Sequence, residues 1–96
     1  MASQRKSRLT QHEIDAIARA IADPRRFAIL QQVAAQPGMP CAALEEHDSI
    51  SPATISHHMK ELSEAGLIEI LREGRTANLT LCREKWQAYL DHLAQL

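Results

Sequence analysis

The sequence is poor in the residues that mark disulfide-rich, membrane-spanning or aromatic-cored proteins. It has one phenylalanine, one tryptophan, one tyrosine and two cysteines among 96 residues. No apolar run approaches the roughly 18 residues of a membrane span, and no signal-peptide stretch follows the basic start of the chain. We therefore expect a cytoplasmic protein that does not enter the membrane and whose core consists mainly of aliphatic side chains.

The chain also lacks a strong charge of either sign. Its formal net charge is −1, which gives no overall electrostatic attraction to nucleic acid, so any such binding must depend on local clusters of positive charge. The length and the 45% hydrophobic content predict one globular domain. A domain this small buries a modest share of its surface and often gains stability by dimerising.

The cysteines and histidines form no recognisable site. Cys41 and Cys82 lie far apart without a C-x-x-C pattern, so neither a disulfide framework nor a zinc module is encoded locally. If the fold brought the two α-carbons within about 7 Å they would form a redox pair, and buried inert thiols are the alternative. No set of nucleophile, base and orienting residue is visible. We expect no enzyme activity, no cofactor and no metal site.

The first half of the chain predicts helices. Residues 1–9 carry basic side chains with little to bury and predict a disordered arm, so the folded domain is expected over 10–96. Thr10 and Glu13 form a capping-box pattern before a helix over 11–22. Further signals place a second helix from Asp23-Pro24 to about residue 35 and a short third helix from Pro40 to about residue 47.

The second half predicts one more helix, a hairpin and a last helix. Ser51 as N-cap, Pro52 at the first position and Gly66 after the last turn delimit the fourth helix. Two strand-like runs follow, 67–71 and 77–81, separated by a charged tip at 72–76, and a helix over 83–96 ends the chain. The fold class is mainly α with a small β-hairpin: a winged helix-turn-helix of five helices and a two-stranded wing.

The fourth helix has the features of an element that reads DNA. At helical spacing, Ile55, Met59 and Leu62 share an inner face. A helix that enters the major groove needs short side chains, hydroxyl donors and a free N-terminus that attracts anions. The opposite face offers these, and we predict DNA contacts from Ser51, Ala53, Thr54, Ser56, His57 and Lys60. An ordinary capped surface helix is the alternative.

Two further features bear on this reading. Arg72 and Arg75 flank a glycine at the hairpin tip and suit phosphates or the minor groove, although a solvated turn would have the same composition. Adjacent residues of a helix point about 100° apart, so His57 is expected to face outward while His58 is a hydrogen-bonded, partly buried structural residue. The helix and the hairpin together favour DNA binding.

The sequence resembles the ArsR-type family of winged helix-turn-helix repressors over nearly all of the chain after the arm. The resemblance rests on Ala22-Asp23-Pro24-Arg25-Arg26-Phe27, on Ser56-His57-His58-Met59-Lys60-Glu61-Leu62 continuing into Ala65-Gly66-Leu67-Ile68, and on Arg72-Glu73-Gly74-Arg75. It implies a homodimer joined through the first and last helices, which binds a pseudo-palindromic operator and represses transcription until an inducer binds.

Periodicity agrees with such a dimer. The first helix (Ile14, Ile17, Ile21) and the last helix (Trp86, Leu90, Leu93) carry more apolar surface than one small core must absorb. The alternative is that the two helices pack on each other within one chain.

The sequence does not identify the inducer, which could be a metal, a redox signal or a small molecule, or could be absent. The paired cysteines of the family's metal sensors are reduced here to Cys41 alone, and Asp91 and His92 have no further ligand after them, which makes a metal the minor alternative.

The sequence therefore predicts a DNA-binding transcriptional regulator. Its expected partners are duplex DNA and a second copy of the chain. The alternative is a winged-helix protein-interaction module with little DNA binding, for which the near-neutral charge would suit a protein partner.

Overall fold

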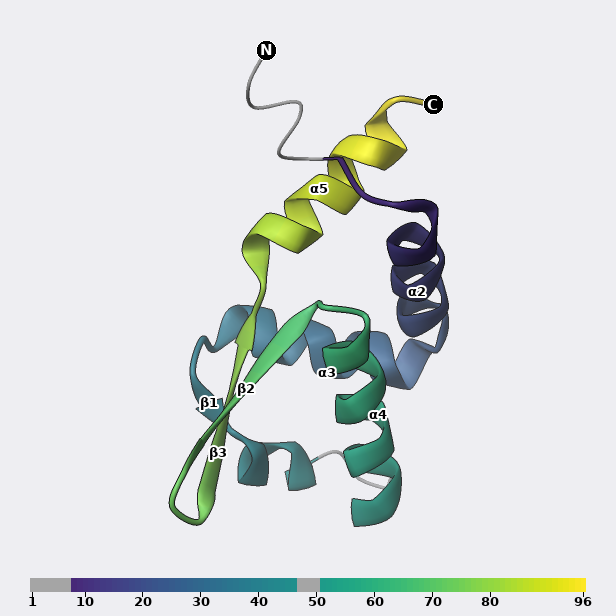
Figure 1. The fold of residues 1–96 in the computed structure, drawn as a ribbon. Coiled ribbons are helices and arrows are strands. Elements are labelled where there is room, and N and C mark those ends of the chain that lie inside the picture. Colours follow the sequence, from purple (N-terminus) through teal and green to yellow (C-terminus); the bar gives the residue numbers. More distant parts are fainter. Residues whose placement is uncertain (1–7, 47–50) are drawn as a thin grey trace.

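The computed structural model describes residues 8–46 and 51–96, without the side chains of Glu45 and Glu46. Within these residues four α-helices and one 3-10 helix pack with a small antiparallel sheet, whose hairpin projects from the body (Figure 1). The elements are α2 (Gln11–Ala22), α3 (Pro24–Ala35), β1 (Met39–Pro40), η1 (Cys41–Glu46), α4 (Pro52–Glu64), β2 (Ile68–Glu73), β3 (Thr76–Leu81) and α5 (Arg83–Ala94).

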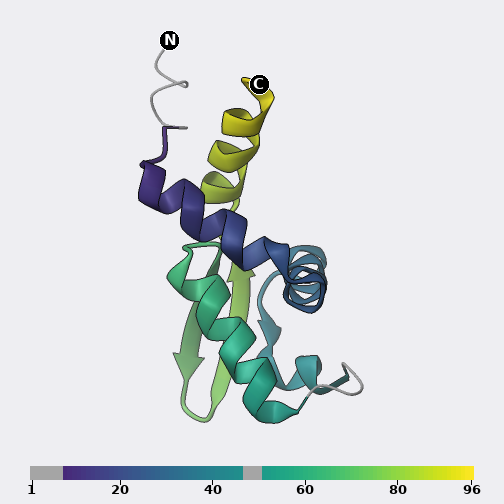
Figure 2. The ribbon, with the colours of Figure 1, turned by 90° about the vertical axis from the view of Figure 1, so that its right-hand side faces the viewer.

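The first two helices begin at the predicted caps. The Thr10 hydroxyl accepts a hydrogen bond from the Glu13 amide, and the Glu13 carboxylate accepts one from the Thr10 amide, which completes the capping box. The Asp23 carboxylate accepts bonds from the amides of Arg25 and Arg26. Because Asp23 alone separates the helices, α3 turns sharply away from α2 (Figure 2).

The predicted third α-helix is wrong in its type and its start. Residues Cys41–Glu46 form a 3-10 helix, and Pro40 belongs to a strand rather than to the first turn. The element has six residues, and helical pieces this short commonly adopt the 3-10 form. The described chain thus has four α-helices where the sequence predicted five.

The sheet has three strands instead of the predicted two. Its order is β1-β3-β2, and β1 pairs antiparallel with β3, Met39 facing Leu79. The amide of Gly38 donates to the Leu79 carbonyl at 2.9 Å. The backbone groups of residues 38–40, which follow α3, thus find hydrogen-bond partners on the open edge of β3. No local sequence pattern predicts this pairing.

One core joins the helices to the hairpin. Side chains from every part of the described chain take part, and the largest fully buried ones are Ile17, Ile29, Val33, Leu44, Leu62, Leu67 and Leu79. Leu9, expected in the arm, is half-buried against this cluster, while residues 1–7 lie outside the described residues.

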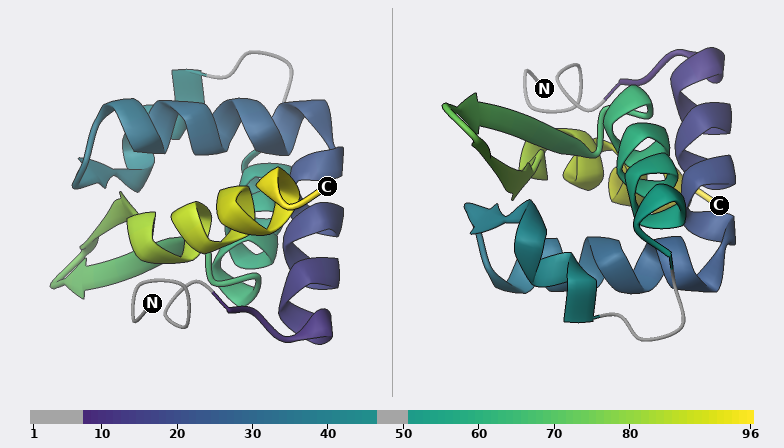
Figure 3. Two further views of the ribbon diagram at one scale, coloured as in Figure 1. Left: turned by 90° about the horizontal axis from the view of Figure 1, so that it is seen from above. Right: turned by 90° about the horizontal axis from the view of Figure 1, so that it is seen from below.

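The last helix, α5, lies at the end of the molecule opposite to the hairpin tip. Seen from above, it crosses over the body from the hairpin side toward α2, with α3 along one edge (Figure 3). Lys85 of α5 pairs with Glu13 of α2. None of the helices in the described part of the chain is both long enough and apolar enough to span a bilayer.

Candidate nucleic-acid interface

The two ends of α4 are fixed by different devices. At the start, the Ser51 hydroxyl accepts a bond from the Thr54 amide at 3.2 Å and lies 2.9 Å from the Thr54 hydroxyl. At the end, the Leu67 amide donates to the Leu62 carbonyl across Gly66, which has a φ of +78°. A β-carbon at Gly66 would also press on the Lys85 side chain at 3.1 Å. The hydroxyls of Ser51 and Thr54 therefore hold the helix start.

One face of α4 is anchored and the other is open to solvent. Ile55, His58 and Leu62 are buried, and Met59 is half-buried against the core. Of the predicted DNA contacts on this helix, Thr54 is half-buried, and the exposed side chains are those of Ala53, Ser56, His57 and Lys60. The anchored face fixes the direction in which the open face points.

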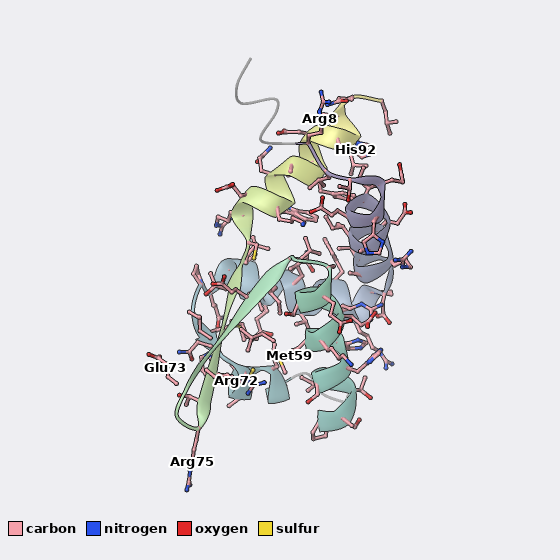
Figure 4. The ribbon with its side chains drawn as sticks, viewed as in Figure 1. Arg8, Met59, Arg72, Glu73, Arg75 and His92 are labelled. Carbon is pink, nitrogen blue, oxygen red and sulfur yellow. The ribbon has the colours of Figure 1, made fainter. Side chains whose placement is uncertain are left out.

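The wing differs slightly from its predicted form. Its strands extend to Glu73 and resume at Thr76, so the turn is only Gly74-Arg75 and Arg72 lies within β2, opposite Ala77. Gly74 has a φ of +61°, as two-residue hairpin turns require. The Thr76 hydroxyl donates to the Glu73 carbonyl at 2.7 Å and closes the turn. Arg75 projects from the tip, away from the body (Figure 4).

The hairpin tip and the N-terminal end of α4 lie at the same end of the molecule (Figures 1 and 2). Arg72 and Arg75 are both exposed, and Lys60 adds a third cation on the open face of α4. Glu73 lies between the two arginines in sequence, and its carboxylate accepts a bond from the Asn78 amide group at 3.4 Å. The positive side chains predicted as contacts are thus exposed on the two elements that share this end.

Among the described residues that are polar or charged, His58 alone is buried. It is 5% exposed, which confirms its predicted inward position, and its Nδ1 has no hydrogen-bond partner among the described residues. Burial lowers the pKa of His58, and the nearby Asp23 carboxylate opposes part of that change. Burial on the inner face of α4 therefore favours the neutral form of the His58 imidazole.

The structure does not bring the two cysteines together. Cys41 follows β1 and Cys82 follows β3, and the antiparallel register of β1 and β3 places them toward opposite ends of β3, about 16 Å apart along the strand. Both thiols are free, and burial raises the pKa of each. Cys41 Sγ instead lies 3.3 Å from Met59 Sδ. A disulfide between Cys41 and Cys82 does not fit this fold.

Potential metal ligands are also dispersed. Among the residues that the structure describes, no three side chains of histidine, cysteine, aspartate or glutamate lie close enough to hold a metal ion.

Sequence reasoning gave no role to Arg26, which the structure makes a link between helices. Its guanidinium bonds to the carbonyls of Arg19 and Ala20 at the end of α2. The only local signal for this contact is the position of Arg26, three residues after Asp23, where the first helix ends.

Comparisons with known proteins agree with this architecture. Residues 21–70 match the helix-turn-helix domain family. The chain is 32% identical over 75 residues to an uncharacterised helix-turn-helix-type transcriptional regulator of Bacillus subtilis, covering 77% of this chain and 75% of that one. It is also 32% identical over 88 residues to the arsenical resistance operon repressor of Staphylococcus xylosus, covering 91% and 79%.

Solved structures share the fold. An ArsR family transcriptional regulator superimposes with a TM-score of 0.80 at 22% identity, over 91% of this chain and 89% of that one. An ArsR-like transcriptional regulator from Rhodococcus sp. RHA1 gives a TM-score of 0.76 at 20% identity, over 88% and 78%. The chain thus belongs to the ArsR-type family of winged helix-turn-helix transcriptional regulators.

Proposed function

We propose that this protein is a homodimeric repressor that binds a pseudo-palindromic operator in duplex DNA and acts in the cytoplasm. The observation that carries the proposal is the open face of α4, where Ala53, Ser56, His57 and Lys60 are exposed on a helix whose other face is locked into the core. A helix held in this way can enter the major groove without losing its own packing.

The residues on this face suit different parts of DNA. Ala53 and Ser56 are small enough for close approach, and the His57 imidazole can hydrogen-bond to base edges. Ser51 and Thr54 lie at the helix start, where their hydroxyls and the positive end of the helix dipole suit a phosphate. Lys60 and the wing residues Arg72 and Arg75 are assigned to the backbone or the minor groove.

The dimer is proposed to form through α2 and α5. Leu90 and Leu93 are 39% and 42% exposed on α5 and, three residues apart, share one face of that helix. From α2 the contribution is smaller than the sequence suggested, because Ile17 is fully buried in its own chain and Ile14 and Ile21 are half-buried against the same core. Two copies would present two α4 helices to successive major grooves, about 34 Å apart.

Selection of bound sequences from random duplex DNA tests the proposal. We expect one enriched motif with two related half-sites. His57→Ala should relax discrimination at particular bases, whereas Lys60→Ala should weaken all sequences alike and reduce the salt dependence by about one phosphate contact. Arg19→Ala, which removes a positive charge from exposed α2, is the matched control.

Enrichment of no motif at moderate salt would contradict DNA reading. Association that responds weakly to salt would instead support a protein-interaction module, because phosphate contacts release counterions and make affinity fall steeply as salt rises.

A further inference from the structure

A half-enclosed apolar hollow lies where α3, the end of β3 and the first turns of α5 meet. Its volume is about 190 Å³, and it is lined by Phe27, Leu30, Gln31, Ala34, Leu81 and Trp86. Leu30 and Leu81 form a buried floor, 4% and 8% exposed. Gln31 is the one exposed polar residue among them.

The size of the hollow matches a single ring. Apolar cavities of about 150 Å³ bind benzene, so 190 Å³ accommodates one ring with a short substituent. An α-helix with its side chains is about 10 Å wide, which is too wide for this recess. The side chains of Phe27 and Trp86 offer aromatic surfaces against which a bound ring can pack.

A cation stands next to the hollow. The Arg83 guanidinium donates a 3.1 Å hydrogen bond to the carbonyl of Ala34, a lining residue. Arg83 also precedes Trp86 by three residues on α5, so the two share one helix face. A guanidinium carries five N–H donors and this bond uses one. None of the lining residues is acidic.

We propose that this hollow binds small aromatic carboxylates, with the ring between Phe27 and Trp86 and the carboxylate on Arg83. The ring gains from apolar burial and the carboxylate from charge-assisted hydrogen bonds. The site is separate from the open face of α4. Its lining residue Leu81 belongs to β3, the strand that leads back to the hairpin turn. This ligand-binding role goes beyond the function proposed above.

The single tryptophan provides the test, because all indole emission of these 96 residues comes from Trp86. Titration with benzoate at neutral pH should change that emission saturably, at a midpoint independent of protein concentration. Benzyl alcohol, of similar size and uncharged, should bind at least tenfold more weakly. No DNA is present, so failure here leaves the DNA-binding proposal untouched.

Two pairs of variants separate the parts of the proposal. Ala34→Leu fills the hollow and should abolish binding, whereas Ala35→Leu, exposed on the same helix and outside the lining, should bind as the wild type does. Arg83→Gln should weaken benzoate about tenfold and leave benzyl alcohol unchanged. Arg19→Gln removes a distant charge and should change neither.

Absence of saturable change, or equal benzoate affinity in wild type and Arg83→Gln, would overturn the proposal. So would a midpoint that shifts with protein concentration, because a second copy would then occupy the hollow. If circular dichroism showed that Ala34→Leu does not fold, the Arg83→Gln comparison decides the question.

Discussion

Arg26 Nε donates a 2.7 Å hydrogen bond to the carbonyl oxygen of Ala20 and thereby ties the start of α3 to the end of α2. The last carbonyls of a helix have no partner within it and carry partial negative charge, so a guanidinium is well suited to them. The contact fixes the direction in which α3 leaves α2.

Replacement of Arg26 by alanine should lower the free energy of unfolding by about 1.5 kcal/mol, because a charge-assisted hydrogen bond to half-buried carbonyls is lost. Urea unfolding at one protein concentration measures it. Arg25→Ala is the control: its side chain is exposed, and a change within about 0.5 kcal/mol is expected. Equal losses in both variants would contradict the proposed role of Arg26.

Ser51→Ala should destabilise the protein by about 1 kcal/mol, since the Ser51 hydroxyl caps the Thr54 amide. Ser56→Ala, five residues further along α4 and exposed, should leave the stability within about 0.5 kcal/mol of the wild type. Thermal unfolding distinguishes the two. Recovery of most of the loss in Ser51→Gly would agree with a cap, because glycine is tolerated at that position.

The ion pair between Glu13 and Lys85 should make stability depend on acid pH. The bond from Lys85, with the Thr10 amide second, lowers the pKa of Glu13 from 4.5 to about 2. A lowered carboxyl pKa stabilises the fold fully above pH 4.5, and that stabilisation is lost as the pH falls toward 2. A double-mutant cycle of Glu13→Gln and Lys85→Met, measured by urea unfolding, should therefore show coupling at pH 6 that vanishes near pH 2. Coupling that stays constant would contradict this assignment.

His58 should add a second loss of stability in the same direction, as the pH falls through a window nearer to neutral. Burial lowers its pKa below the ordinary 6.5, so the folded protein binds fewer protons than the unfolded chain. Stability should be greatest above pH 6.5 and fall as the pH drops below it. Urea unfolding between pH 5 and 8 measures the slope, which His58→Gln should reduce. His57→Gln keeps His58 and should retain the wild-type slope; a slope lost with His57 would refute the assignment.

Local chemistry predicted the helix boundaries well. Thr10, Asp23 and Ser51 cap the helices that they were expected to cap, and Gly66 ends α4 in the positive-φ conformation. These features depend on hydrogen bonds within a few residues, so the sequence around each one contains the whole interaction. The inward turn of His58 followed from helical spacing in the same way.

Non-local interactions explain what was missed. Pro40 resembles the first residue of a helix, yet pairing with Asn78, distant in sequence, makes it part of a strand. Ile17 carries the periodicity of an interface residue, but the other helices cover it completely. Periodicity shows that a face is buried and does not show which partner buries it.

The features of the candidate interface also divide into those set by local sequence and those set by tertiary packing. The sequence by itself determined that α4 has an apolar face and a small, hydroxylated, basic face, because that depends only on spacing along one helix. Only the tertiary structure decided that the start of α4 and the tip carrying Arg75 share one end of the molecule, that Cys41 and Cys82 do not meet, and that Nδ1 of His58 has no partner within the described residues. These outcomes depend on how separate elements pack, and contacts between residues far apart in the chain leave no periodic trace in its sequence.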